Sequence, residues 1–175
     1  MELINGKLNQ FQQEDTLNAN IFLTNLNRLN INGNKLSNVF FLSNMRDLQV
    51  LYLNNNFIND LTPFENLSQL QTLVLYDNQI ESVFALRHLS NLKTLNLGKN
   101  NIVDISPLKE LVNLQDLNLS YNKITQIGEL SGLVKLKQLN LTGNSVTDKS
   151  SLSGLPILKK IIICFRISES LPLLI

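Results

Sequence analysis

The chain has 175 residues, including 37 Leu and 26 Asn but only 7 Gly, 4 Pro and no Trp, which excludes an average globular composition and indicates a periodic structure. The apolar fraction of 43% excludes disorder, and the net charge of +1 gives no strong field that would attract nucleic acid or an acidic membrane. One Cys and one His exclude a disulfide framework and a Cys/His zinc site, so we expect no metal and no cofactor.

Residues 1–25 come first in the chain and keep only fragments of the pattern that follows, with Leu17 and Leu23 in phase. We therefore predict an atypical N-terminal capping segment. Its first residues lack the basic start and the continuous apolar block of a secretory signal. The chain contains no run of about 18 apolar residues, so no membrane span is predicted. These features together predict a cytoplasmic protein with no membrane span.

From Leu26 onwards the sequence repeats with a period of 22 residues, giving six complete repeats over residues 26–157. Counted from this first Leu, positions 1, 4, 6, 11, 14, 17 and 20 of each repeat are apolar, and Lys149 is the single exception. Position 9 is Asn in all six repeats: Asn34, Asn56, Asn78, Asn100, Asn122 and Asn144.

This spacing predicts one coil per repeat. Positions 4 and 6 point to the same face of a short strand, whereas positions 11, 14, 17 and 20 step by three and suit a 3₁₀ or irregular return segment. A single coil cannot bury its apolar side, but stacked neighbours can. The position-9 Asn carries a donor and an acceptor for backbone groups at the end of the strand, so we interpret this column as structural.

Residues 158–175 form a partial last repeat and a C-terminal tail. The segment Ile161–Phe165 predicts an apolar edge strand with little to cover it. We expect the protein to self-associate through this edge, because an uncovered strand recruits another.

The pattern L-x-x-L-x-L-x-x-N-x-I resembles the leucine-rich repeat family over residues 26 to about 163. "LYDNQIESV" and "LSYNKITQI" resemble the leucine-rich regulatory subunit of protein phosphatase 1. "DLTPFENL" at 60–67 and "DISPLKEL" at 104–111 resemble the bacterial internalins. The resemblance implies an α/β solenoid, a right-handed coil with a parallel sheet on the concave face and 3₁₀ or irregular return segments.

Candidate catalytic groups are few. His88 falls at position 19 on the return side, and Cys164 lies among apolar neighbours, as expected for a buried thiol. Asp60, Asp104 and Asp148 recur at position 13, so they stack as a surface row and do not converge. The chain has no Gly-rich phosphate loop. We therefore predict that the protein is not an enzyme.

Function is expected on the strand side, because positions 2, 3, 5, 7 and 8 are not needed for the core. All three Tyr of the chain fall there, and exposed aromatic residues are common anchors of protein interfaces. Basic residues outnumber acidic ones on this side, with a bias towards the C-terminal half; a plain solvated surface is the alternative interpretation of both features. The predicted partner-binding residues are Val50, Tyr52, Val74, Tyr76, Asp77, Lys93, Asn96, Lys99, Asn118, Tyr121, Lys137 and Asn140.

These observations favour a non-catalytic protein–protein interaction module, with a regulatory or scaffold role and a protein partner of unknown identity. The alternative is an internalin-type bacterial adhesin or effector that binds a host protein. Nucleic-acid binding is disfavoured, because the net charge is near zero and the face carries only three aromatic side chains.

Overall fold

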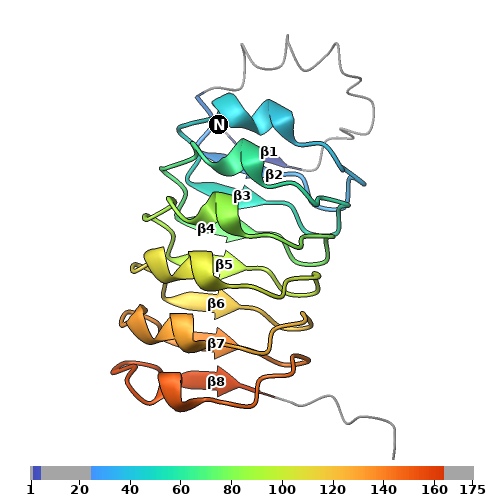
Figure 1. Cartoon of the computed structure of the whole chain (residues 1–175). Helices are drawn as coiled ribbons and strands as arrows, with labels where there is room; N and C mark the ends of the chain where they lie inside the picture. Colours follow the sequence, from blue (N-terminus) through green and yellow to red (C-terminus); the bar gives the residue numbers. More distant parts are fainter. Residues whose placement is uncertain (1, 5–24, 164–175) are drawn as a thin grey trace, which may run out of the picture.

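A computed structural model describes residues 2–4 and 25–163 and shows a solenoid of stacked coils (Figure 1). Eight described strands form one parallel sheet in chain order, from β1 to β8. The strands are β1 (Glu2–Ile4), β2 (Arg28–Asn30), β3 (Val50–Tyr52), β4 (Thr72–Val74), β5 (Thr94–Asn96), β6 (Asp116–Asn118), β7 (Gln138–Asn140) and β8 (Lys160–Ile162). This confirms the predicted parallel sheet with one strand per repeat.

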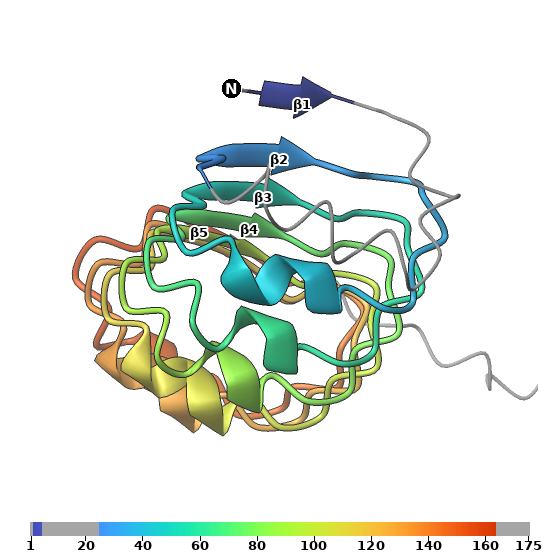
Figure 2. The same ribbon diagram turned by 90° about the horizontal axis from the view of Figure 1, so that it is seen from above.

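A 3₁₀ helix lies in each return segment from the first repeat to the sixth. These helices are η2 (Phe40–Asn44), η3 (Thr62–Phe64), η4 (Phe84–Leu86), η5 (Ser106–Glu110), η6 (Gly128–Gly132) and η7 (Ser150–Leu152). Viewed along the stack, the strands line one side and the 3₁₀ helices line the opposite side (Figure 2). The predicted 3₁₀ return path is therefore confirmed.

The register of the sheet follows the sequence repeat. From β2 to β8 each residue pairs with the residue 22 positions further on, as Leu51 does with Leu73. β1 departs from this rule, because Leu3 pairs with Leu29, a spacing of 26 residues. The predicted N-terminal segment thus supplies a further strand out of phase with the repeats, whereas Leu17 and Leu23 lie outside the described residues.

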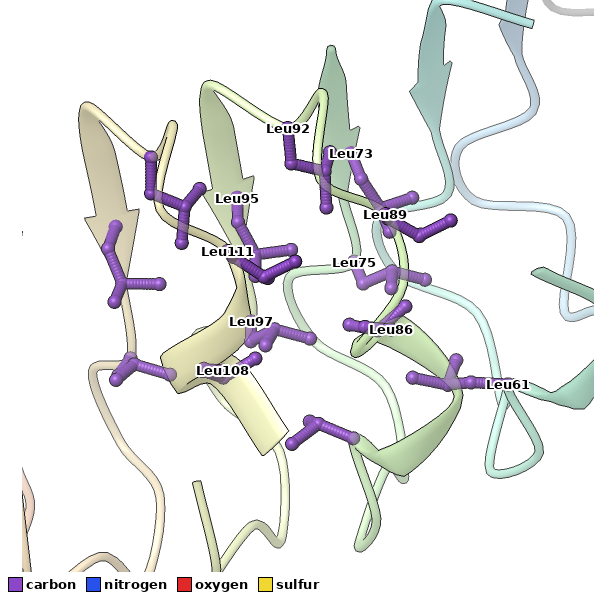
Figure 3. Packing of buried hydrophobic residues seen from close by; sticks show 14 of the residues in the cluster. Leu61, Leu73, Leu75, Leu86, Leu89, Leu92, Leu95, Leu97, Leu108 and Leu111 are labelled. Atoms are coloured by element: carbon purple, nitrogen blue, oxygen red, sulfur yellow. The ribbon is translucent and has the colours of Figure 1, made fainter. Parts of the chain in front are cut away.

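The core is a continuous strip of Leu and Ile between the strands and the return segments. Figure 3 shows Leu95 pointing towards Leu111, and Leu97 towards Leu108. Burial of each such side chain contributes about 2 kcal/mol relative to an exposed one. Lys149, the one polar residue at an apolar position, is exposed at the start of η7, so no charge enters the core.

The Asn column joins neighbouring coils through buried side chains. Asn100 Nδ2 donates to the backbone oxygen of Leu97 in its own coil and to that of Leu75 in the preceding coil, each at 3.0 Å. Its Oδ1 accepts a hydrogen bond from the Ile80 N–H at 3.0 Å. Asn78, Asn122 and Asn144 repeat these three bonds one coil apart.

The C-terminal coil is less covered than the others. Ile161 occupies a position that is buried in the preceding coils, yet it is 45% exposed, and Ile162 is 40% exposed. The predicted edge segment is thus apolar and exposed at Ile161 and Ile162, whereas Ile163 packs partly against the core and Cys164 and Phe165 lie outside the described residues.

Candidate functional site

The predicted partner-binding residues all lie on or beside the strands, on the surface that we name the strand face. Alternation along each strand turns the position-4 Leu inwards and the side chains at positions 3 and 5 outwards. Parallel pairing then places equivalent side chains next to each other, about 4.8 Å apart. The strand face therefore consists of rows that run across the coils.

An aromatic and aliphatic cluster occupies the N-terminal half of this face. Tyr52 on β3 is the register partner of Val74 on β4, and both are half-buried. Arg28 lies over the Tyr52 ring, with its guanidinium carbon 5.3 Å from the ring centroid. Val50 and Tyr76 flank the pair in sequence and are also half-buried. We name Val50, Tyr52, Val74 and Tyr76 the aromatic cluster.

Two tyrosines pack on glycines of the following coil. A Cβ atom added to Gly98 would lie 2.8 Å from Tyr76 Cδ2, and one added to Gly143 would lie 2.6 Å from Tyr121 Cδ1. Gly98, Gly143 and the neighbouring Ser120 are buried. Positions 7 and 8, which the repeat pattern leaves free of core packing, are covered at these three residues by aromatic rings and adjacent coils.

Position 8 of each repeat turns the chain through a left-handed backbone conformation. Its φ is 68° at Gly33, 55° at Asn55, 59° at Asp77, 55° at Lys99, 53° at Tyr121 and 74° at Gly143. This conformation is unfavourable for a bulky residue such as Tyr. Tyr121 is nevertheless 49% exposed, so the bend presents its ring to solvent.

Charged residues on the strand face contact neighbouring coils. Lys99 Nζ lies 2.6 Å from Asp77 Oδ2, and this hydrogen bond raises the pKa of Lys99. Lys93 donates to Gln71 Oε1 at 3.0 Å and Lys137 donates to Gln115 Oε1 at 2.7 Å. Asp77 and Lys99 are therefore bonded to each other across two neighbouring coils.

The three strand-face asparagines also make local bonds. The Oδ1 atoms of Asn96, Asn118 and Asn140 accept hydrogen bonds from the N–H group two residues further on, at 2.9 to 3.0 Å. These amides therefore help to end the strands, a role that the sequence pattern did not reveal. We name them the outer Asn row.

A groove crosses β5 to β8 beside this row, with a cavity volume of about 220 Å³. Its side chains come from Thr94, Asn96, Asp116, Asn118, Gln138, Asn140, Lys160 and Ile162. Asp116 was not among the predicted site residues, although it lies at the centre of the groove on β6. The signal in the sequence is its position: it is the one acidic residue in a row that otherwise holds Arg28, Val50, Thr72, Thr94, Gln138 and Lys160.

A larger hollow of about 680 Å³ lies on the opposite side, between η4 and η5. Phe84 is 57% exposed there, and the Arg87 guanidinium carbon lies 3.8 Å from its ring centroid. His88, close by in sequence, is exposed. Within residues 2–4 and 25–163 no three His, Cys, Asp or Glu residues gather in a way that could hold a metal ion. The same residues contain no helix that is long and apolar enough to cross a membrane.

Comparison with known proteins agrees with this architecture. A family model described as "Leucine Rich repeats (2 copies)" matches residues 24–66, 68–110 and 112–156. No curated protein matches the chain.

Three solved structures are similar over most of the chain. Internalin C2 of Listeria monocytogenes is 36% identical with a TM-score of 0.74, over 78% of this chain and 60% of that one. An internalin (inlF) of the same organism is 31% identical with a TM-score of 0.80, over 83% and 44%. A leucine-rich repeat protein of Leptospira interrogans is 30% identical with a TM-score of 0.80, over 95% and 43%.

The chain thus spans between 43% and 60% of the length of these proteins. The match to the family model covers most of the sequence, and the period, the sheet and the Asn column all fit it. The chain belongs to the leucine-rich repeat family, and it resembles the bacterial internalins.

Proposed function

We propose that the chain is a non-catalytic protein-binding module that holds a protein partner on its strand face. The observation that carries the proposal is the aromatic cluster, where Tyr52 and Val74 lie side by side with half-exposed side chains. Large aromatic side chains with adjacent apolar surface dominate the energy of protein interfaces. The rows of this face are rigid, because the strands on which they stand are fixed to each other by the sheet.

Tyr121 supports the same proposal from further along the face. Its backbone is held in an unfavourable conformation with φ at 53° while the ring remains 49% exposed. The same conformation recurs at position 8 of every repeat, so the bend of the coil imposes it and holds the Tyr121 ring in a fixed, exposed place. A partner that covers both the aromatic cluster and Tyr121 would cross β3 to β6.

The proposal is tested with proteins captured from the native host by three forms of the chain. Wild type and Lys109→Ala, a change in the hollow on the 3₁₀ side, should retain the same partner. The double variant Tyr52→Ala/Tyr76→Ala should lose it. With the purified partner, removal of one aromatic anchor should weaken binding about thirtyfold, equivalent to about 2 kcal/mol. Retention by the double variant and loss by Lys109→Ala would place the binding surface on the opposite side.

The lysines at the edge of the face should act differently from the tyrosines. Lys93→Ala and Lys137→Ala should slow association and reduce its dependence on salt, because exposed charges steer encounter more than they hold a complex. A change confined to the dissociation rate would contradict this assignment.

Two settings fit a module of this kind. One is a regulatory or scaffold subunit in the cytoplasm. The other, favoured by the likeness to Listeria internalins, is a bacterial adhesin or effector that binds a host protein. Fractionation of the native cells distinguishes the two, since the protein should stay with the cytoplasm in the first case and reach the cell surface or medium in the second.

The exposed side chains of β8 add a proposal about self-association. Ile161 and Ile162 stand on a strand that has a neighbour on one side among the described residues, namely β7. Exposed strand edges of this kind pair with other chains. Light scattering should show mass rising with concentration, and Ile161→Lys should reduce the effect; a constant monomer mass would reject the proposal.

A further inference from the structure

Asp116 carries an unsatisfied group at the centre of the groove across β5 to β8. Among the described residues, its Oδ1 is the one covered side-chain oxygen or nitrogen that has no hydrogen-bond partner. Removing a carboxylate oxygen from water without giving it a donor is unfavourable. Covered polar atoms in folded proteins nearly always have a hydrogen-bond partner. Because Asp116 lies in a groove of the strand face, a bound group could supply the missing donor.

No cation within the described part of the chain compensates this carboxylate. Asp77, the other acidic residue of the strand face, pairs with Lys99 at 2.6 Å. Lys93 and Lys137 instead direct their ammonium groups to Gln71 and Gln115.

The strands next to Asp116 also bring no cation to it. In the register of the sheet its neighbours are Thr94 and Gln138, which carry no charge, and Lys160 follows one strand further away. A lysine side chain is long enough to span two strand spacings, about 10 Å, but the ion pairs found among the described residues do not include one between Lys160 and Asp116.

The opposite wall of the groove offers hydrogen-bond donors. The Oδ1 atoms of the outer Asn row are occupied by the backbone N–H groups of Gly98, Ser120 and Thr142. This fixes the amides of Asn96, Asn118 and Asn140, whose Nδ2 groups make no hydrogen bond within the described residues. Three amide donors thus recur about 4.8 Å apart along one row of the strand face and are available to acceptors of a bound segment.

The geometry points to a subsite in this groove for a single basic side chain, a guanidinium or an ammonium group, carried by an extended segment of the protein partner. The basic group bonds Asp116, and carbonyl oxygens of the segment accept from the outer Asn row. A charge-assisted hydrogen bond is about twice as strong as a neutral one, and here it also satisfies a carboxylate oxygen, Oδ1, that is covered and has no donor. The positive charges of Lys137 and Lys160 near the groove disfavour further basic residues in the bound segment on either side of this basic side chain. The inference rests on the proposed function, since it assumes that a protein occupies the strand face.

Random linear heptapeptides displayed on phage test the chemistry of the groove without a known partner. Selection on the wild-type chain should enrich Arg or Lys at one position, flanked by neutral or acidic residues. Selection on Asp116→Lys should replace this preference by Asp or Glu. A synthetic peptide from the first selection should bind Asp116→Asn about tenfold more weakly, or worse. A selection whose preferences are the same on wild type and Asp116→Lys would overturn the subsite.

A second measurement uses the isolated chain alone. Because Asp116→Asn removes an uncompensated charge, it should raise the urea midpoint of unfolding while it weakens peptide binding. The control is Asp104→Asn, an exposed carboxylate that accepts two hydrogen bonds from Ser106, at 2.8 Å and 3.0 Å. This control should not raise the midpoint. A midpoint that falls in Asp116→Asn would show that the carboxylate stabilises the fold, and would overturn the assignment of Asp116 to a ligand.

The two proposals fail in different ways. If capture of the host partner depends on Tyr52 and Tyr76 but the peptides show no basic preference, the proposed subsite is wrong, whereas the proposal that a protein binds the strand face is supported. If capture depends on the 3₁₀ side, the proposed function is wrong, whatever the peptides show.

Discussion

Asn118 and Asn122 belong to the same coil and lie four residues apart, yet they differ in burial and in the hydrogen bonds that their side chains make. Asn122 is buried, donates to the backbone oxygens of Leu97, Leu119 and Ser120, and accepts from Ile102 N–H. Asn118 is half-buried, and its side chain accepts one bond, from Ser120 N–H. Residue type alone therefore does not separate structural from functional positions in this repeat. The burial of the side chain and its number of hydrogen bonds to the neighbouring coil separate them.

The largest effect is expected from Asn122→Ala. The change leaves backbone groups of two coils without partners in a site that water does not reach, so it should lower the free energy of unfolding by about 3 kcal/mol. Urea denaturation followed by circular dichroism measures this. Asn101→Ala, a half-buried Asn near the same bend of the preceding coil, is the control and should change stability by less than about 0.5 kcal/mol. Equal effects of the two changes would remove the distinction between the Asn column and other asparagines.

Asn118→Ala should have an intermediate effect. It removes one hydrogen bond of 2.9 Å at a site that solvent partly reaches, so the expected loss is about 1 kcal/mol. Measured beside Asn122→Ala in the same coil, it gives the contrast between the two rows directly. A loss as large as that of Asn122→Ala would mean that the outer Asn row is primarily structural, and would weaken its assignment to the groove.

The smallest effect is expected from Asp148, in a third row on the exposed side of the coil. The hydrogen bond from Ser150 N–H lowers the pKa of this carboxyl below its ordinary value of 3.8. A depressed pKa in the folded state means that the contribution to stability is present above pH 3.8 and is lost as the pH falls through the folded value. Asp148→Asn should therefore lower stability slightly near pH 7 relative to Asp47→Asn, and this difference should disappear as the pH falls below the folded pKa of Asp148. An effect larger at pH 3 than at pH 7 would contradict this linkage.

The fold follows from the sequence because one period determines it. Apolar residues at positions 4 and 6 require a strand with one buried face, and Asn at position 9 places the bend, so the sheet and the core could be predicted residue by residue. β1 could not, because Leu3 joins the sheet 26 residues before its partner and thus outside the period.

The site was less predictable, because it depends on contacts between coils that no period encodes. The packing of Tyr76 on Gly98 arises from how a side chain meets the next coil. The left-handed backbone of Tyr121 and the hydrogen bond from Ser120 N–H to Asn118 arise instead from local geometry that residue type alone does not reveal. Asp116 was overlooked for the same reason: its carboxylate is unusual only in the absence of a donor from the strands beside it. A list of outward-facing positions locates the strand face but does not rank the residues on it.

The direction of the Asn bonds makes the two ends of the solenoid unequal. From Asn56 onwards each Asn of the column bonds backbone groups of the coil before it, as Asn100 does with Leu75 and Ile80. At the Asn column a coil therefore depends on its successor: loss of the following coil removes the side-chain partners of two main-chain groups, whereas loss of the preceding coil leaves an Asn side chain without those partners. Local unfolding should therefore differ from coil to coil. The rate of amide hydrogen exchange in a coil should depend more on the coil that follows it than on the coil that precedes it. For the same reason, a segment moved into another repeat protein should contain one coil and the position-9 Asn of the next coil. The 22-residue sequence repeat alone lacks that Asn.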